Sequence, residues 1–363
     1  HAPGLRGEEA RSYASAGIST DHECFTREEA LDKLAAGMHI LIREGSAARN
    51  FEALVDLLHD YPDKIMFCSD DKHPDSLAEG HINQLCARAV AKGIDVFKVL
   101  RAACVNPVQH YRAPVGQLQP GDPADFILVK DLANFEVIAT FLDGIRVAAS
   151  GQSFIESRPP QVINRFDCPP KKLSDFEWRV ADNSPLPVIE ALDGQLITRR
   201  IECEPTLREG LVQADPERDL LKLVVINRYR EAPVAQALIR HFGLRAGALA
   251  SSVAHDSHNI VAVGADDASL CRAVNLVIAA RGGISCVQGE EEKLLPLPVA
   301  GLMSDQDGYQ VAKAYTALDR MAHGLGSPLG APFMTLSFMA LLVIPHLKLS
   351  DLGLFASDRF EFI

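Results

Sequence analysis

The 363-residue sequence lacks the signatures of several protein classes. Its eight cysteines are scattered singly and form no Cys-x-x-Cys pair, which argues against a disulfide framework or a zinc ribbon and favours a reducing cytoplasm. There is no Gly-x-Gly-x-x-Gly, no Walker loop and no His-Glu-x-x-His motif. The longest apolar stretch, residues 331–345, is too short for a bilayer span, so we expect a buried core segment and no membrane association.

Positive charge is also scarce. The chain has 36 Lys and Arg against 48 Asp and Glu, a net charge of −12. A general nucleic-acid binder needs clustered Lys and Arg, so the charge balance argues against that class and is compatible with a small neutral or cationic substrate. The first residues are polar and Gly-rich rather than basic and then apolar, so no secretory signal is predicted there.

Three regions differ in their sequence patterns. In residues 1–112, strand and helix patterns alternate, which predicts βα units and a parallel sheet. Residues 113–165 predict a small antiparallel β-unit, with a hairpin turn at Asp143-Gly144. Residues 166–363 predict a separate α/β or α+β domain. The expected strands are 17–20, 38–42, 64–68, 220–227 and 260–264; the expected helices are 8–16, 26–36, 47–60, 75–92, 95–103, 233–242, 267–281 and most of the chain after 305.

Polar clusters follow the apolar, strand-like runs of the first region. His1, His22 and Asp70 stand at such positions in that order. The carboxyl ends of the strands carry the chemistry of a (β/α)₈ barrel, and these residue types suit Zn²⁺, Mn²⁺ or Fe²⁺. The fold class predicted is therefore the C-terminal half of a metal-dependent (β/α)₈ barrel, with a front half that we expect to be absent from this sequence. The competing interpretation is that each histidine is an ordinary loop or core residue.

Several longer segments resemble the adenine deaminase family of the amidohydrolase superfamily. They extend over essentially the whole chain and comprise residues 1–5 (HAPGL), 20–23 (TDHE), 42–46 (IREGS), 67–74 (FCSDDKHP), 251–259 (SSVAHDSHN) and 294–304 (LLPLPVAGLMS). The resemblance implies hydrolytic deamination of adenine, a small purine base, to hypoxanthine and ammonia by a metal-activated hydroxide. It also implies a binuclear centre of Mn or Fe in the intact enzyme, and the ligand types would accept Zn as well.

The same resemblance assigns roles to single residues. His1 and His22 would be metal ligands at the ends of the fifth and sixth barrel strands, and Asp70 would be a ligand and proton shuttle at the end of the eighth. Asp71 is the rival for that role. The family's His-x-His pair and bridging carboxylate are missing here. We therefore expect the front half of the barrel to exist in the functional enzyme, either as an associated piece or as sequence not included here.

Other polar residues of the strand ends are candidates for supporting roles. Glu23 is predicted to be catalytic or to orient the His22 imidazole, with a solvated loop acid as the alternative. The predicted substrate-binding residues, for which a loop salt bridge is the alternative, are Arg43, Glu44, Ser46 and Asp71.

The last domain offers less direct signals. His255, Asp256 and His258 form a compact cluster that predicts a separate metal site, a loop capping the active site or an ordinary surface turn. We expect the domain to serve as a lid or a dimer surface, and hence a homo-oligomer. Cys68 lies inside a predicted strand and is expected to be a small core residue rather than a nucleophile.

Two other functions remain open at this point. A dihydroorotase-like hydrolysis of a cyclic amide would keep the superfamily, and a binding or scaffolding fragment would keep only the fold. Nucleic-acid deaminases are poor candidates, because their His-x-Glu and Pro-Cys-x-x-Cys zinc signature is absent from the sequence.

Overall fold

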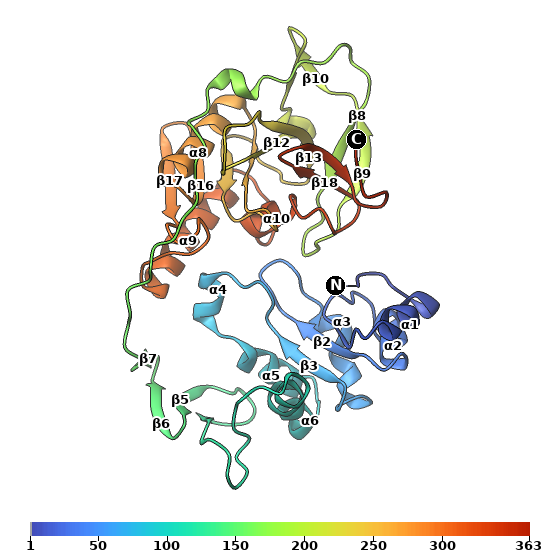
Figure 1. Cartoon of the computed structure of the whole chain (residues 1–363), viewed down its shortest axis with the longest axis vertical. Helices are drawn as coiled ribbons and strands as arrows, with labels where there is room; N and C mark the ends of the chain where they lie inside the picture. Colours follow the sequence, from blue (N-terminus) through green and yellow to red (C-terminus); the bar gives the residue numbers. More distant parts are fainter. Residues whose placement is uncertain (1) are drawn as a thin grey trace. The chain divides into compact units, whose positions relative to one another are not determined.

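The computed structural model describes residues 2–363, which form two compact units. Unit 1 comprises the chain up to Lys72 together with Glu79–Arg158, and unit 2 comprises His73–Ala78 and Pro159–Ile363. The first two predicted regions thus fall largely within one unit. Figure 1 shows both units and labels most of their elements.

A three-stranded parallel sheet forms the centre of unit 1. Its strands are β1 (Thr20–Asp21), β2 (His39–Arg43) and β3 (Ile65–Cys68), in the order β1-β2-β3. The predicted parallel βα pattern is therefore found, and the mixed α/β class is confirmed. Within residues 2–363 this sheet does not close into a barrel, so the half-barrel stays a prediction.

The helices of unit 1 follow the predicted pattern with two corrections. The segment predicted as one helix over 47–60 is helical only from Phe51, and the predicted helix 75–92 is interrupted at Gly80-His81. Thr26 caps its helix as its spacing predicts, because its hydroxyl accepts from the Glu29 amide at 3.2 Å. The elements are α1 (Gly7–Ser15), α2 (Arg27–Ala35), α3 (Phe51–Leu54), a 3₁₀ helix (Val55–His59), α4 (Pro74–Glu79, mostly assigned to unit 2), α5 (Ile82–Ala91), α6 (Val96–Leu100), a π-helix (Arg101–Val105) and α7 (Asn106–Tyr111).

The small β-unit is a four-stranded antiparallel sheet in unit 1. Its strands are β4 (Phe126–Val129), β5 (Val137–Leu142), β6 (Ile145–Ala149) and β7 (Gln152–Ser153). The predicted Asp143-Gly144 hairpin is confirmed, since both residues have positive φ, +49° and +75°, between paired β5 and β6.

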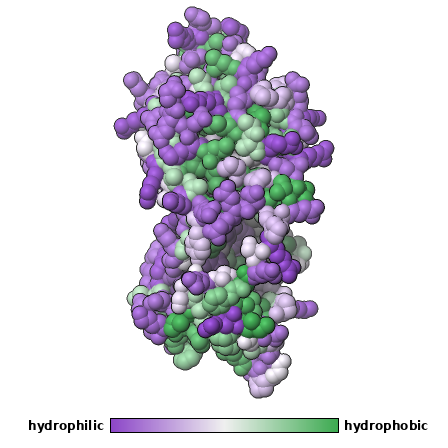
Figure 2. All heavy atoms as spheres, turned by 90° about the vertical axis from the view of Figure 1, so that its left-hand side faces the viewer, coloured by the Kyte–Doolittle hydropathy of each residue, from purple (hydrophilic) through white to green (hydrophobic). Residues whose placement is uncertain are grey.

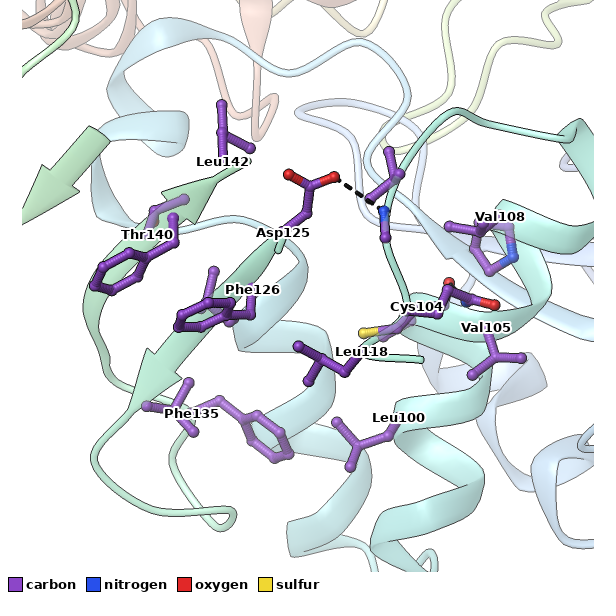
Figure 3. Close-up of a pocket in the computed structure, with 18 of the residues that line it drawn as sticks. Leu100, Cys104, Val105, Val108, Leu118, Asp125, Phe126, Phe135, Thr140 and Leu142 are labelled. Carbon is purple, nitrogen blue, oxygen red and sulfur yellow. Dashed lines mark hydrogen bonds between the residues drawn. The ribbon is translucent and has the colours of Figure 1, made fainter. Parts of the chain in front are cut away.

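This β-unit exposes apolar surface and borders a cavity of about 680 Å³. Figure 2 shows hydrophobic side chains gathered on the lower part of one face. Figure 3 shows the cavity, around which apolar side chains such as Leu100, Leu118 and Phe135 gather. Its carboxylate, Asp125, is already bonded to the amides of Gly116 and Asp143 at 2.9 and 2.7 Å. The cavity therefore offers mainly apolar contacts, and its one carboxylate is already hydrogen-bonded.

An eight-stranded sheet forms the core of unit 2. Its strand order is β17-β16-β14-β15-β12-β13-β8-β9, and all neighbours are antiparallel except β13 and β8. Helix α8 (Asp267–Ala279), which matches the prediction, packs its apolar side against these strands. The strands are β8 (Leu186–Glu190), β9 (Arg199–Cys203), β12 (Leu221–Ile226), β13 (Ala235–Arg240), β14 (Ala248–Ser251), β15 (Ile260–Gly264), β16 (Gly283–Gln288) and β17 (Glu291–Pro296), with a separate hairpin of β10 (Thr206–Arg208) and β11 (Leu211–Gln213).

Two sequence predictions for unit 2 are wrong. The expected helix over 233–242 is β13, because its residues pair with both β12 and β8 in the middle of the sheet. The chain after 305 is helical only in α9 (Gly308–Gly324) and α10 (Pro332–Phe338). It ends in a three-stranded sheet of β18 (Leu347–Ser350), β19 (Gly353–Ala356) and β20 (Glu361–Phe362).

The apolar stretch 331–345 is a core segment, as predicted. Every residue of α10 is buried. Across residues 2–363, the structure contains no helix whose length and apolar character would let it cross a bilayer.

A buried lysine makes the stability of unit 2 depend on pH. Lys348 in β18 is fully buried and donates to the carbonyls of Leu196 and Phe338 at 2.6 and 3.1 Å. Burial lowers its pKa from 10.5 to about 7. Between these two values the unfolded chain binds more protons than the folded chain, so folded stability rises with pH.

We therefore expect the free energy of unfolding of the wild type, relative to Lys348→Met, to rise with pH above about 7. The limiting slope is about 1.4 kcal/mol per pH unit. Urea unfolding of both proteins across this range measures the difference. A difference that does not change with pH would contradict the assignment.

Candidate active site

Three side chains meet where the parallel strands of unit 1 end. His22 follows β1, Arg43 is the last residue of β2, and Asp70 lies two residues beyond β3. His22 Nε2 lies 3.7 Å from Asp70 Oδ2, and Arg43 Nη1 donates a hydrogen bond to the same oxygen. The structure thus brings together two of the three predicted metal ligands. The third, His1, lies outside the described residues.

The Asp70 loop is held against the loop that follows β2. The Ser46 amide donates to the Asp71 carbonyl at 2.9 Å. Gly45 makes this approach possible, because a Cβ at that position would lie 2.8 Å from the Asp71 carbonyl oxygen and 3.2 Å from that of Ser69. Asp70 itself has a φ of +55°, in the left-handed region, so its side-chain direction depends on this neighbouring loop.

Arg43 and Asn50 connect the site to the body of the sheet. The Arg43 side chain is only 1% exposed, and its backbone amide donates to Asn50 Oδ1 at 2.8 Å. Asn50 Nδ2 donates to the carbonyls of His22 and Cys24 at 3.2 and 3.1 Å. Asn50 therefore ties the end of β2 to the His22 segment. Asn50 was not among the predicted site residues, because the sequence pattern placed it inside a helix. The available signal was that Asn is favoured at the N-cap of a helix, which is where Asn50 stands, directly before Phe51.

Glu23 follows His22 directly in the sequence, and its side chain is buried. Burial raises the pKa of its carboxyl, and the nearby charges of Arg43 and His22 act in the opposite direction. Its backbone amide donates to Asp21 Oδ1 at 3.2 Å. A buried acid with a raised pKa is a candidate for holding a proton.

The other predicted substrate-binding residues differ in their surroundings. Glu44 Oε2 accepts from Arg88 Nη1 at 2.6 Å, so this carboxylate takes part in a salt bridge. The Arg88 guanidinium lies 3.9 Å from the centre of the Phe51 ring. Ser46 is buried, whereas Asp71 is exposed.

A second group of potential ligands lies deeper in unit 1. Among residues 2–363, Asp21, Cys24 and Glu29 form the only group of three or more His, Cys, Asp or Glu side chains close enough to share a metal ion. The Lys33 ammonium already occupies the space between them, 2.7 Å from Asp21 Oδ2 and 2.8 Å from Glu29 Oε1. The cation of this cluster is therefore a lysine.

The remaining candidates contribute no reactive group at the strand ends. Burial raises the pKa of the Cys68 thiol to about 12, which argues against a nucleophile, but the residue is half-buried and does not belong to the core as predicted. His255 in unit 2 packs with its ring 4.8 Å from that of Phe338 and 5.7 Å from that of His258. The described residues show no ligand cluster there, so the geometry does not favour a separate metal site at 255–258.

Two family models match parts of this chain. Residues 1–147 match the model of the Amidohydrolase family, and residues 195–361 match that of the Adenine deaminase C-terminal domain. The region that carries the parallel strand ends is thus the one that matches the Amidohydrolase family model.

Curated relatives identify the family more specifically. The chain is 56% identical to an adenine deaminase of Salinibacter ruber and 54% identical to one of Sulfurovum sp. (strain NBC37-1). Each match covers 100% of this chain and 67% of the relative. An adenine deaminase of Methanosarcina acetivorans is 49% identical, with 68% of its length covered. The chain therefore belongs to the adenine deaminase family, a family of hydrolases, and spans about two thirds of the length of these relatives.

A solved structure was also found, that of a β-aspartyl dipeptidase from Fervidobacterium islandicum AW-1. It covers 36% of this chain and 38% of its own, with 19% identity and a TM-score of 0.29. At that score the match does not bear on the fold.

Proposed function

We propose that the complete enzyme hydrolyses adenine to hypoxanthine and ammonia at a divalent-metal site to which His22 and Asp70 contribute ligands. The observation that carries the proposal is the approach of His22 Nε2 to Asp70 Oδ2, 3.7 Å apart at the carboxyl edge of a parallel sheet. Family membership supplies the substrate, since the relatives are named adenine deaminases.

The donor atoms fit a metal ion. Bonds from Zn²⁺ to imidazole nitrogen and carboxylate oxygen are about 2.1 Å long, so two such ligands can be up to about 4.2 Å apart. The measured 3.7 Å lies within that reach. Both side chains are about one quarter exposed, which leaves the edge accessible to a substrate.

Two ligands do not complete a metal site. We propose that His1 supplies a third and that further ligands come from sequence outside these 363 residues, because the relatives are about half as long again. The family favours Mn or Fe in a binuclear arrangement, and one such ion would acidify a bound water molecule.

Asp70 is the proposed proton carrier. Its carboxylate would take a proton from the attacking water and deliver it to the exocyclic amino group that leaves adenine as ammonia. Arg43 donates to Asp70 Oδ2 from a buried position and so fixes the direction of that carboxylate. The loop contact between Ser46 and Asp71 holds the backbone on the other side.

Glu23 and Arg43 are the proposed partners of the purine ring and its protons. Glu23 is buried, and its raised pKa suits a group that holds a proton near the amino group of adenine. Nε and Nη2 of Arg43 have no hydrogen-bond partner within residues 2–363. Adenine has ring nitrogens that are acceptors, such as N3 in its N9–H form, and these would take such donors where the substrate reaches the buried Arg43 atoms. Ser46 and Asp71 are proposed to border the substrate, and Glu44 to act through its salt bridge with Arg88.

The test is a substrate comparison with the complete enzyme. Adenine and dihydroorotate are offered separately, with and without prior removal of metal by a chelator, and hypoxanthine, ammonia and carbamoyl-aspartate are quantified. We expect turnover of adenine only, lost on chelation and restored by Mn²⁺ or Fe²⁺. Hydrolysis of dihydroorotate at a comparable rate would favour the cyclic-amide alternative, and no turnover of either would favour a binding role.

A further inference from the structure

We propose that Lys33 is a positioning residue that fixes the distance between the two segments carrying His1 and His22. The inference rests on the proposed metal site, in which both histidines are ligands. It concerns a residue far from the strand ends in the sequence, on α2. Neither the strand-end pattern nor the family matches assign it a role.

The Lys33 ammonium bonds to both segments at once. Its side chain is fully buried. Nζ donates to the carbonyl of Ala2 at 2.5 Å and to Asp21 Oδ2 at 2.7 Å. Ala2 follows His1 in the sequence, and Asp21 precedes His22. One cation thus joins a backbone atom beside the first histidine to a side chain beside the second.

The carboxylates around Lys33 extend this connection on both sides. Glu29 Oε1 accepts from Lys33 at 2.8 Å and from the Gly4 amide at 2.7 Å. Its other oxygen, Oε2, accepts from the Phe25 amide at 3.1 Å. Asp21 Oδ1 accepts from the Glu23 amide at 3.2 Å. Backbone amides of the 2–4 segment and of the residues just after His22 are therefore bonded to the same cluster.

Such a cluster matters because metal ligation tolerates little displacement. Ligand distances in a working site stay within about 0.2 Å of their preferred values. Groups that orient the ligands typically contribute about 10–100-fold to metal affinity. Replacing the ammonium would leave Asp21 and Glu29 as two buried carboxylates without their cation, and both would separate or protonate. Either response moves the 2–4 and 21–25 segments.

A second buried lysine provides the matched control. Lys222 in β12 is fully buried as well, and its ammonium bonds to Asp267 at 2.8 and 2.9 Å and to the Phe176 carbonyl at 3.0 Å. It belongs to unit 2, as do its bonding partners Asp267 and Phe176. Lys222→Met therefore removes an equally buried ammonium, paired with a carboxylate that is 22% exposed, without touching the proposed link.

The experiment measures Mn²⁺ affinity of the complete enzyme by titration, after the metal has been removed, for the wild type, Lys33→Met and Lys222→Met. We expect Lys33→Met to weaken Mn²⁺ binding by about 10–100-fold and Lys222→Met to leave it near the wild-type value. We also expect amide hydrogen exchange in Lys33→Met to rise in residues 2–7 and 21–25. A folded Lys33→Met with wild-type Mn²⁺ affinity would overturn the proposal, as would an equal loss in both variants.

A replacement variant and a wild-type control complete the experiment. If Lys33→Met does not fold, Asp21→Asn carries the test, because it weakens the bond from Lys33 to the His22 segment and leaves Glu29 as the charged partner of the ammonium. Weakened Mn²⁺ binding supports the proposal, and unchanged binding overturns it. Failure of the proposed function shows itself separately, as a wild type that neither binds Mn²⁺ nor deaminates adenine.

Discussion

Asp70→Asn is expected to lower kcat for adenine deamination by about 10³-fold, near the middle of the range for losing a positioned proton carrier. The amide is nearly the same size but cannot accept the proton, and it is a poorer metal ligand. It also removes the charge that Arg43 Nη1 contacts. Steady-state kinetics with adenine, together with the far-ultraviolet circular dichroism of the variant, measure the effect on a folded protein.

Asp71→Asn is the matched control for this substitution. Asp71 is adjacent in sequence and, like Asp70, exposed, and the bond from the Ser46 amide uses its backbone carbonyl, which the substitution retains. We expect kcat of this variant to stay much closer to the wild-type value, and the change in its proposed contact with the substrate to appear in KM. The reverse order, with Asp71→Asn as the inactive variant, would transfer the proton-carrier role to Asp71.

His22→Ala is expected to weaken Mn²⁺ binding by at least about 100-fold, because losing a direct ligand costs more than losing the group that orients it. Its Nε2 is the nitrogen that faces Asp70 Oδ2 at 3.7 Å. Metal content after dialysis, measured by elemental analysis, reports the loss independently of catalysis, and kcat is expected to fall with it.

His39→Asn provides a comparison on the same sheet. His39 begins β2, and so lies at the opposite end of the strand from Arg43; burial lowers its pKa. We expect this variant to retain the Mn²⁺ content of the wild type. Equal metal loss in both histidine variants would mean that His22 acts through general stability rather than by ligation.

The parallel strand ends could be predicted from the sequence because they depend on local signals. Short apolar runs followed by polar residues locate β1, β2 and β3, and strand direction then brings His22 and Asp70 to one edge. The same reasoning could not rank Arg43, Glu44 and Ser46. Which of these side chains faces Asp70 depends on loop conformation, such as the close approach of Gly45 to the Asp71 backbone.

The missed features share a non-local cause. Residues 235–240 form a strand because they pair with the preceding strand β12 and with the distant β8, and the local sequence does not reveal the pairing with β8. Lys33 lies four residues after Glu29, a spacing typical of an exposed helix pair worth a few tenths of a kcal/mol. Its importance comes instead from Ala2 and Asp21, which lie 31 and 12 residues away.

The chain leaves unit 1 after Lys72, contributes His73–Ala78 to unit 2, and returns at Glu79. The ring of His73 lies 4.3 Å from that of Tyr315 in α9, so residues 73–78 pack against unit 2. No single cut in the polypeptide can therefore separate the two units cleanly. Truncation after Arg158 would leave residues 73–78, which follow the Asp70 loop, without their packing partners in unit 2. Recombination between relatives at that point would have to match α9 of one parent to residues 73–78 of the other.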